Sequence, residues 1–278
     1  MTRLGIIGLG EMGGSIAAGV LGGPWGDEVT VVGCDVSEEA RERFAALGGV
    51  VAGSPGEVAR QVDLVAVVVV DDAQVRLVGG GDDGVIAGAA ESGALVAVHA
   101  TVRPATVVGL ADEAAGAGVR VIDAPVTGGI QGARSRDLVV LCGGDPGDVE
   151  RARPHLARYG SLVIHVGPLG AAQRAKVARN LITYAELAVA QEAIALAAAA
   201  GVDLGAFAEI VNHSDRTIGP HVGTFTRPIV HPPPPMGGSY TAIAHKDLQG
   251  ALALAEELGV DLPITALVDQ HMDAAFGE

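Results

Sequence analysis

Short apolar runs alternate with amphipathic stretches over residues 3–165 of the chain. The runs are rich in valine, leucine and isoleucine. They are apolar on both faces of a pleated strand, as is usual where helices cover a sheet on each side. The helical segments between them are short enough to serve as crossover connections. The pattern predicts an α/β fold with a doubly wound, mostly parallel sheet. Strands are expected at residues 3–8, 28–35, 64–70, 94–100, 119–125, 138–144 and 161–167.

The pattern changes after Gly170, where the strand signals stop. The next 30 or so residues have high helix propensity and continue without a break to Gly201. A run of four prolines, Pro232–Pro235, then interrupts the helical pattern. Three helices are expected in this part of the chain, at residues 171–201, 203–212 and 246–259.

The chain has 278 residues, which corresponds to about two domains at roughly 150 residues each. A glycine and a proline in Val166-Gly167-Pro168 break the pattern directly before the long helix. We therefore expect a first domain over residues 1–166 and an all-α second domain over residues 167–278.

Composition excludes several classes of protein. Hydrophobic residues make up 49% of the chain and charged residues 18%, and the mean hydropathy is +0.39, so most of the chain is expected to fold. The net charge of −15 offers no positive field for a phosphate backbone or an anionic lipid surface. Nucleic-acid binding and membrane-surface binding are therefore not expected.

One apolar stretch, residues 181–200, is long enough to span a membrane. Its polar side chains would be costly in hydrocarbon, so we interpret it as a buried helix of a soluble protein. These side chains are Thr183, Tyr184, Glu186, Gln191 and Glu192. The N-terminal sequence lacks the basic region and long apolar run of a signal peptide.

Cysteine and histidine positions predict neither a disulfide framework nor a metal site. Cys34 and Cys142 lie far apart and outside any CxxC pattern, which fits a reducing cytoplasm. The histidines of the second half show no ligand-like spacing and are interpreted as packing or surface groups. They are His213, His221, His231 and His245.

A glycine motif, Gly8-Leu9-Gly10-Glu11-Met12-Gly13, follows the first strand directly and opens an apolar helix. In that context Gly8 permits a tight turn, Gly10 lets the backbone approach a pyrophosphate, and Gly13 allows close packing of the helix. The positive helix N-terminus favours the phosphate charge. A glycine-rich turn without a ligand is the alternative, but the strand–turn–helix order favours a Rossmann-like dinucleotide site.

The second predicted strand ends at Asp35, about 20 residues after the motif, where an acidic side chain bonds the ribose diol of NAD. Its carboxylate would repel the 2′-phosphate of NADP, and residues 36–39 supply no arginine to neutralise that phosphate. NAD is therefore the expected cofactor. Asp35 could instead be an ordinary acidic residue at a helix N-terminus.

Taken together, four stretches resemble the β-hydroxyacid dehydrogenases, the family of 3-hydroxyisobutyrate dehydrogenase and tartronate semialdehyde reductase, related to 6-phosphogluconate dehydrogenase. The second and third stretches are specific to this family. The resemblance implies a Rossmann-like domain, a helical domain, and homodimers or homotetramers assembled through the helical half. The four stretches are residues 8–13, Asp123–Gly132 (DAPVTGGIQG), Gly167–Asn180 (GPLGAAQRAKVARN), and Lys246–Leu248 (KDL) before a helix ending in LGVDLPIT.

Within this resemblance, Lys176 matches the family's catalytic lysine and Asn180 the asparagine four residues later. Their i, i+4 spacing places an ammonium and an amide on one helix face, where both can reach one small substrate. The position of Lys176 near the helix start disfavours its charge, which suits a proton-transferring group. Outside the family context, a lone lysine on a helix is usually a solvated side chain.

The resemblance also implies a substrate loop at Thr127-Gly128-Gly129, where a hydroxyl and exposed backbone N–H groups hold a carboxylate. A simple β-turn is the alternative interpretation of this cluster. Further cofactor contacts are implied near the nicotinamide and in the loop after the third long strand. The residues at these matching positions are Thr101, Val69, Val70, Gln74 and Lys246.

Some positions depart from the family pattern and concern the substrate. Arg136 stands where the family commonly has glycine, and Arg134 lies two residues before it. Their charges could recognise a further polar or anionic group of the substrate, although a solvated basic turn is favoured. The segment from His231 to Met236 replaces an aromatic-containing segment.

We interpret the chain as an NAD-dependent oxidoreductase that interconverts a small 3-hydroxy acid and its semialdehyde or keto acid. Lys176 would relay the hydroxyl proton, Asn180 would orient the substrate, and the Thr127 loop would hold its carboxylate. Two alternatives stay open, an imine reductase-like enzyme and a catalytically silent NAD-binding module. The presence of Lys176 weighs against both.

Overall fold

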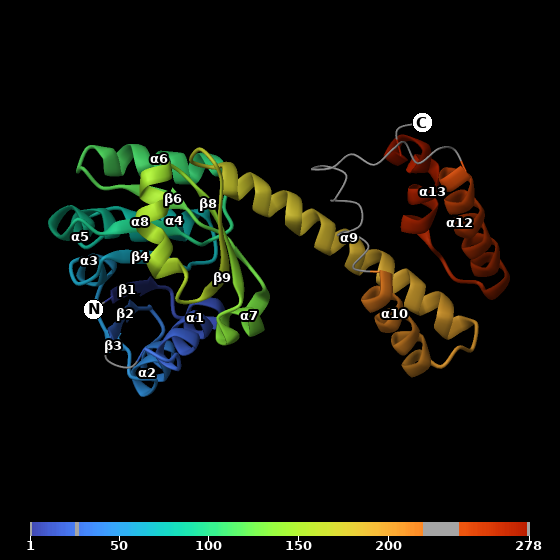
Figure 1. The fold of residues 1–278 in the computed structure, drawn as a ribbon, viewed down its shortest axis with the longest axis horizontal. Helices are drawn as coiled ribbons and strands as arrows, with labels where there is room; N and C mark the ends of the chain where they lie inside the picture. The colour runs from blue at the N-terminus through green and yellow to red at the C-terminus, as the bar shows by residue number, and fades with distance from the viewer. Residues whose placement is uncertain (1, 26–27, 219–238, 277–278) are drawn as a thin grey trace. The chain divides into compact units, whose positions relative to one another are not determined.

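The computed structural model describes residues 2–25, 28–218 and 239–276 (Figure 1). The chain divides into two compact units, Met1–Arg179 and Asn180–Glu278. The first unit contains the sheet and its covering helices, and the second unit is helical over its described residues.

The first unit is built on a sheet in the order β3-β2-β1-β4-β5-β6, and neighbouring strands in this series are parallel. This confirms the doubly wound α/β fold, and each of the seven predicted strands is present. Strands β3 and β7 were not expected, because each is only two residues long. The strands are β1 (Thr2–Ile7), β2 (Val29–Cys34), β3 (Val50–Val51), β4 (Leu64–Val67), β5 (Leu95–Val98), β6 (Val121–Asp123), β7 (Val126–Thr127), β8 (Leu138–Gly143) and β9 (Gly160–Gly167).

The strand direction reverses beyond β6. Strand β8 pairs antiparallel to β6 and β7, and β9 returns parallel to β8. The chain then leaves β9 at Gly167 and begins the long helix a few residues later. This edge of the sheet therefore sets the starting point of that helix.

Helices cover both faces of the sheet, as Figure 1 shows. In β5, Leu95 and Ala97 belong to the core on one face, and Val96 and Val98 belong to the core on the other. This burial on both faces explains the unbroken apolar strand runs. The covering helices are α1 (Glu11–Leu21), α2 (Glu38–Ala46), α3 (Pro55–Ala59), α4 (Asp72–Gly79), α5 (Val85–Ser92), α6 (Pro104–Ala115), α7 (Gly129–Ser135) and α8 (Pro146–Leu156).

The predicted long helix is confirmed as α9 (Ala171–Ala199), and two further helices, α10 (Leu204–Ile218) and α12 (Ser239–Leu258), occupy the other predicted positions. Helix α12 begins earlier than expected, and α13 (Pro263–Phe276) follows it. The proline run and the segment from His231 to Met236 lie outside the described residues.

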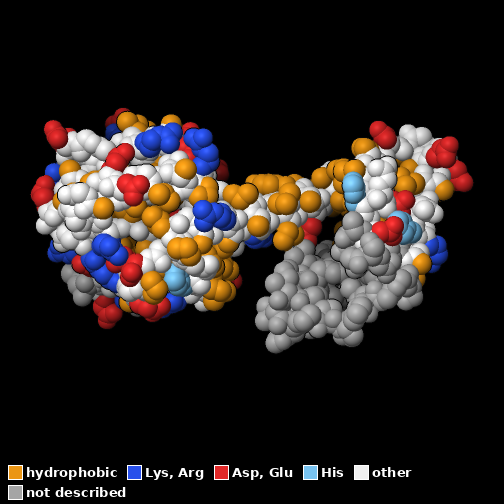
Figure 2. Space-filling view, turned by 90° about the horizontal axis from the view of Figure 1, so that it is seen from above, with side chains coloured by type: hydrophobic (Ala, Val, Ile, Leu, Met, Phe, Trp, Pro, Cys, Tyr) orange, Lys and Arg blue, Asp and Glu red, His pale blue; other side chains and the backbone are white. Residues whose placement is uncertain are grey.

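The expectation that α9 is buried is wrong. Leu181 is 70% exposed, Tyr184 66% and Leu187 56%, and Figure 2 shows apolar side chains along the helix surface. The alanines and leucines of this segment explain why it is helical and apolar. Neither property determines what packs against the helix, so the sequence could not show whether it is buried.

By length and composition, α9 could also cross a membrane. Within the second unit, however, the Glu192 carboxylate accepts hydrogen bonds from the backbone N–H groups of Ile264 and Thr265, at 2.7 and 2.8 Å. It also accepts one from the Thr265 hydroxyl. A carboxylate on α9 thus caps the start of α13, and a charged group in this position would be costly in hydrocarbon.

Cys34 in β2 and Cys142 in β8 are both free and buried. Burial raises the pKa of each thiol to about 12. Among the described residues, no group of three or more His, Cys, Asp or Glu side chains is arranged to hold a metal ion.

A buried polar pair lies beside the sheet. His99 Nε2 is 2.7 Å from the Tyr159 hydroxyl, and both side chains are buried. His99 Nδ1 has no hydrogen-bond partner among the described residues. Burial lowers the pKa of His99 from its usual 6.5 to about 4, so the folded protein holds this imidazole neutral.

This pair predicts a loss of stability in mild acid. Between about pH 6.5 and pH 4 the unfolded chain binds a proton at His99 that the folded protein does not. The free energy of unfolding should therefore fall as the pH is lowered, by about 1 kcal/mol per pH unit from this group. Urea unfolding of the wild type and of His99→Gln across this range measures the effect. Equal losses in both proteins would contradict the prediction.

Candidate active site

The glycine motif lies at the carboxyl end of β1, between β2 and β4. The neighbours of β1 lie on opposite sides of it, β2 following and β4 being reached later through α3, and this switch point is the position of the ligand crevice in doubly wound sheets. Gly8 has φ +93°, and a Cβ on it would lie 2.3 Å from the Val68 carbonyl oxygen. Only glycine therefore allows the turn to pass this close to the loop after β4.

The motif leaves the start of α1 open. Gly10 is the N-cap of α1 and supplies no side-chain cap, and a Cβ on it would have no atom within 4 Å. Gly13 is different, because a Cβ there would lie 1.9 Å from the Gly8 carbonyl oxygen. An uncapped helix N-terminus beside open space fits a pyrophosphate, and Leu9, Glu11 and Met12 complete this turn.

Asp35 follows β2 and reaches back to the glycine motif. Its Oδ2 accepts a hydrogen bond from the Leu9 N–H at 2.6 Å, and its Oδ1 accepts one from the Ser37 N–H at 2.8 Å. The carboxylate therefore holds the turn of the motif against the end of β2. This places an acidic group at the edge of the crevice.

Residues 36–39 contain no arginine, as stated above, but Arg41 just beyond them does lie near Asp35. Arg41 Nη1 donates to the backbone carbonyls of Asp35 and Val36, at 2.6 and 3.2 Å. The inference considered only the residues directly after Asp35, whereas the first turn of α2 brings Arg41 back beside them. The guanidinium of Arg41 therefore lies next to Asp35.

The loop after β4 lies beside the same crevice. The Val70 N–H donates to Gln74 Oε1 at 3.0 Å, and Val70 is 79% exposed. Val69 Cγ1 would lie 3.4 Å from a Cβ on Gly8. Two of the residues expected at the cofactor, Val69 and Val70, thus lie in the loop next to the glycine motif, and Gln74 bonds to this loop from the first turn of α4.

Thr101 lies on the next loop, after β5. The N–H groups of His99 and Ala100 both donate to the Val67 carbonyl at the end of β4. Ala100 and Val102 are buried, whereas Thr101 between them is exposed. The loop therefore presents the threonine outward from the carboxyl end of β5.

Lys176 lies in the second turn of α9 and is half-buried. Burial lowers its pKa, and the positive charge of Arg179 lowers it further. Asn180 follows four residues later on the same continuous helix, at the point where the second unit begins. A partly desolvated amine of this kind is suited to accept and return a proton.

The Thr127 loop consists of the end of β7 and the start of α7. Gly128 has φ +125° and Gly129 has φ +65°, so both occupy backbone conformations that disfavour a side chain. Gly128 caps α7 without a side-chain bond. The two glycines therefore expose backbone at this position.

Arg136 is used by the fold. Its Nη1 donates to the Gly19 carbonyl at 3.2 Å, and its guanidinium lies 5.6 Å from the centre of the Trp25 ring. Arg158 lies over the same ring at 4.8 Å. Arg136 thus links α7 to the end of α1, and substrate recognition by this residue stays a prediction.

A structural role predicts a specific result for Arg136→Ala. Loss of the cation–π contact and the Gly19 bond should lower the free energy of unfolding by about 1–2 kcal/mol. The emission of Trp25, the only tryptophan in the chain, should change because its environment opens. Thermal unfolding and tryptophan fluorescence measure both. An unchanged melting temperature together with a raised Michaelis constant would favour substrate recognition instead.

Lys246 lies on α12 in the second unit, where it forms an exposed ion pair with Asp247 at 3.2 Å. The preceding His245 lies between Asp269 and Asp273, with its two ring nitrogens 2.7 and 2.9 Å from their carboxylate oxygens. These bonds make His245 a link between α12 and α13. His213 lies on α10, and His221 and His231 lie outside the described residues.

Two polar residues with no role expected from the sequence meet where the end of β6 contacts the start of α9. Asp123 and Gln173 are both fully buried and bond to each other through the Gln173 N–H. The signal was present in the sequence, because each is a polar residue within one of the two family-specific stretches. Burial of a single polar side chain leaves no periodic pattern, so the sequence alone does not show that these two side chains are buried.

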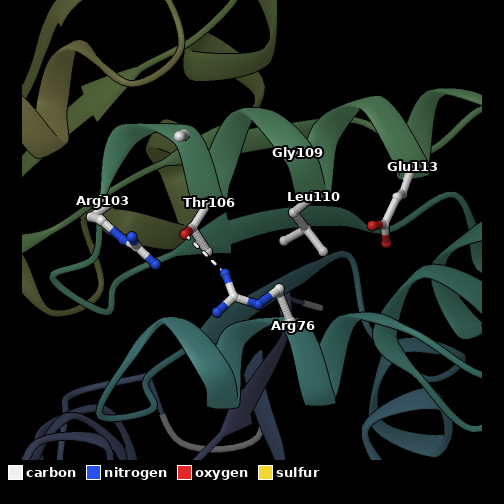
Figure 3. A pocket seen from close by; sticks show the side chains of 7 residues that line it. Arg76, Arg103, Thr106, Gly109, Leu110 and Glu113 are labelled. Atoms are coloured by element: carbon white, nitrogen blue, oxygen red, sulfur yellow. Dashed lines mark hydrogen bonds between the residues drawn. The ribbon is translucent and has the colours of Figure 1, made fainter.

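A cavity of about 230 Å³ lies between α4 and α6 and contains none of the predicted site residues (Figure 3). Arg76 Nη1 donates to the Thr106 hydroxyl at 3.3 Å. Arg103 pairs with Asp72 at 3.4 Å. Because these cations are engaged by neighbouring side chains, the cavity carries no evident chemistry of its own.

Two family descriptions together match nearly the whole chain. Residues 3–167 match the NAD binding domain of 6-phosphogluconate dehydrogenase. Residues 170–278 match a domain described as NAD-binding of NADP-dependent 3-hydroxyisobutyrate dehydrogenase.

Individual proteins agree with these matches. The chain is 38% identical to a Mycobacterium tuberculosis protein described as an uncharacterized oxidoreductase, over 99% of this chain and 93% of the other. It is 31% identical to 3-hydroxyisobutyrate dehydrogenase of Pseudomonas aeruginosa, over 96% and 90%. A crystal structure of a putative oxidoreductase from Mycobacterium avium matches with a TM-score of 0.84 and 34% identity, covering 100% and 99%.

An imine reductase from Myxococcus stipitatus, in complex with NADP⁺, shares the fold with a TM-score of 0.82 and covers 98% of this chain and 93% of its own. Its identity is 19%, so this similarity concerns the fold alone.

Proposed function

Because the chain belongs to the β-hydroxyacid dehydrogenase family, as an NAD(P)-dependent oxidoreductase, we propose that it uses NAD to interconvert a small 3-hydroxy acid and its semialdehyde or keto acid. The observation that carries the proposal is Lys176. This half-buried lysine, with a lowered pKa, lies on the helix that starts at the same edge of the sheet as the crevice. Asn180 follows it by one helical turn.

In the oxidation direction, the carbinol carbon loses a hydride and its hydroxyl loses a proton, and the bound dinucleotide supplies the hydride acceptor. Lys176, as the neutral amine, takes the hydroxyl proton, and it returns this proton in the reverse reaction. Asn180 orients the substrate oxygen. Thr127, Gly128 and Gly129 hold the substrate carboxylate through a hydroxyl and exposed backbone N–H groups.

The cofactor assignment rests on the crevice at β1. The residues present fit a dinucleotide, because the start of α1 is uncapped and Gly10 leaves open space beside it. Asp35 would accept from the ribose hydroxyls. The full set that we assign to the cofactor is residues 8–13, Asp35, Val69, Val70, Gln74, Thr101 and Lys246, with Arg136 kept among the proposed substrate contacts.

The preference for NAD is testable at Asp35. In the wild type, kcat/KM should be higher with NAD than with NADP, because the carboxylate repels a 2′-phosphate. Asp35→Ser should narrow this gap by about tenfold or more, and Arg41 next to it can then face the phosphate. Because Asp35 also holds the Leu9 N–H, some affinity for NAD should be lost as well. A wild type that prefers NADP would refute the assignment.

The same proposal includes the organisation of the chain. Residues 1–166 form the NAD-binding domain, and residues 167–278 form the domain for the substrate and for oligomer assembly. The apolar side chains exposed on α9 support a homodimer or homotetramer in which another copy covers them. Two free, buried cysteines agree with a reducing cytoplasm.

A screen of NAD reduction over a panel of small 3-hydroxy acids tests the function. We expect one or a few substrates to be turned over at rates far above the rest of the panel. Tight NAD binding without turnover of any hydroxy acid would favour a silent module. Reduction of cyclic imines in place of hydroxy-acid oxidation would favour the imine reductase alternative.

A further inference from the structure

Gln173 makes an unusual set of hydrogen bonds for a helical side chain. It lies in the first turn of α9 and is fully buried. Its Nε2 donates to the Ala100 carbonyl at 2.9 Å, and its Oε1 accepts from the Val102 N–H at 3.1 Å. The carboxamide therefore pairs with the backbone on both sides of Thr101, as a neighbouring strand would.

The backbone of Gln173 is fixed as well. Its N–H donates to Asp123 Oδ2 at 2.9 Å, and the Gly170 N–H donates to Asp123 Oδ1 at 2.8 Å. Asp123 is fully buried at the end of β6 and caps the start of α9. Gly143 on β8 makes room for it, because a Cβ there would lie 2.3 Å from Asp123 Oδ1.

These contacts tie three parts of the first unit into one rigid piece: the end of β6, the start of α9 and the loop that carries Thr101. Each bond is buried, so breaking one leaves a polar group without water or partner. Lys176 lies three residues beyond Gln173, about 4.5 Å further along the helix axis. A shift of the helix start relative to the loop would move Lys176 relative to Thr101.

We propose that Gln173 is a positioning residue of the reaction, which locks the Thr101 loop to the helix that carries Lys176. Thr101 stands at the nicotinamide and Lys176 at the substrate hydroxyl in the proposed function, on which this inference rests. The side chain of Gln173 touches neither reactant. It sets the relation between the hydride acceptor and the proton acceptor.

Gln173→Met tests the role, because methionine has similar length and volume but no hydrogen-bonding amide. We expect the single-turnover rate of hydride transfer to fall by about 10²-fold, as is typical of a small misplacement of reacting groups. The dissociation constant for NAD should change less than about threefold, because the glycine motif is untouched. The Val102 amide should exchange with deuterium faster, because it loses its acceptor.

Gln173→Glu adds a readout that a purely structural role would not produce. Burial keeps the introduced carboxyl group protonated to a higher pH than usual, and a protonated acid can donate to Ala100 and accept from Val102 as the amide does. The activity of this variant relative to wild type should therefore rise at least about tenfold as the pH falls from 9 to 6. Gln61→Glu is the matched control, since the Gln61 side chain lies in the turn after α3 and donates an exposed hydrogen bond to the Glu57 carbonyl. The activity of this variant relative to wild type should not change with pH.

The outcomes separate the two proposals. A wild type without turnover on the hydroxy-acid panel would overturn the proposed function. The exchange rate of the Val102 amide in Gln173→Met would then still test whether Gln173 holds the Thr101 loop, and an unchanged rate would overturn that contact. With an active wild type, normal hydride transfer in Gln173→Met would overturn the positioning role. A ratio for Gln173→Glu that does not rise at low pH would overturn it as well, provided that circular dichroism shows both variants folded.

Discussion

Lys176→Ala is expected to lower the single-turnover rate of hydride transfer by about 10²- to 10⁴-fold, the usual effect of removing a positioned acid or base. The affinity for NAD should stay close to that of the wild type, because the glycine motif and Asp35 lie on other elements. The fold should also persist, since Lys176 is only half-buried. Stopped-flow reduction of NAD with the best substrate and fluorescence titration of NAD measure the two quantities.

The oxidation rate should depend on pH through the protonation state of Lys176. In oxidation Lys176 must be neutral, so the rate should rise with pH through the pKa of Lys176. Burial and the charge of Arg179 lower that pKa. The rate should therefore begin to increase at a pH below the usual pKa range of lysine. Lys176→Ala should lose this limb, and Asn180→Ala should keep it while losing less activity. A wild-type limb that survives in Lys176→Ala would refute the assignment of the proton acceptor.

Alanine substitutions at two glycines of the same motif should affect different properties, stability at Gly13 and NAD binding at Gly10. Gly13→Ala should destabilise the first unit by several kcal/mol, because its Cβ would lie 1.9 Å from the Gly8 carbonyl oxygen and the backbone would have to move. Gly10→Ala should cost about 1 kcal/mol or less, because no atom lies within 4 Å of its Cβ. Gly10→Ala should nevertheless weaken NAD binding by about 10²-fold, since the methyl group would occupy the approach to the pyrophosphate.

Thermal unfolding and NAD titration of both variants check this pair. A stable Gly10→Ala protein that binds NAD normally would show that the pyrophosphate does not approach this turn. A Gly13→Ala protein with the wild-type melting temperature would show that α1 can move away from β1 without cost.

The crevice could be anticipated from the sequence because its signals are local. The glycine motif, the apolar strand before it and Asp35 lie within the first 35 residues, and each has a fixed position in a doubly wound fold. The structure adds the physical reason for the glycines at positions 8 and 13, where a side chain would meet the backbone.

The sequence did not reveal which side chains the folded backbone brings together. Arg41 reaches Asp35, six residues earlier, because the first turn of α2 places it beside that residue. Gln173 reaches Ala100 and Val102 across more than 70 residues, and no spacing rule connects them. The exposure of α9 was missed for a related reason, since an apolar helix face indicates that a partner exists and does not indicate which one.

The two buried thiols affect how the protein responds to oxidants. Because only the thiolate reacts rapidly with peroxides, disulfides and alkylating reagents, a pKa of about 12 leaves Cys34 and Cys142 almost entirely unreactive at neutral pH. Cys34 directly precedes Asp35, so this inertness protects the end of β2 from sulfenic acid formation. A cysteine introduced on the surface would then be the single thiol available for labelling in the native protein.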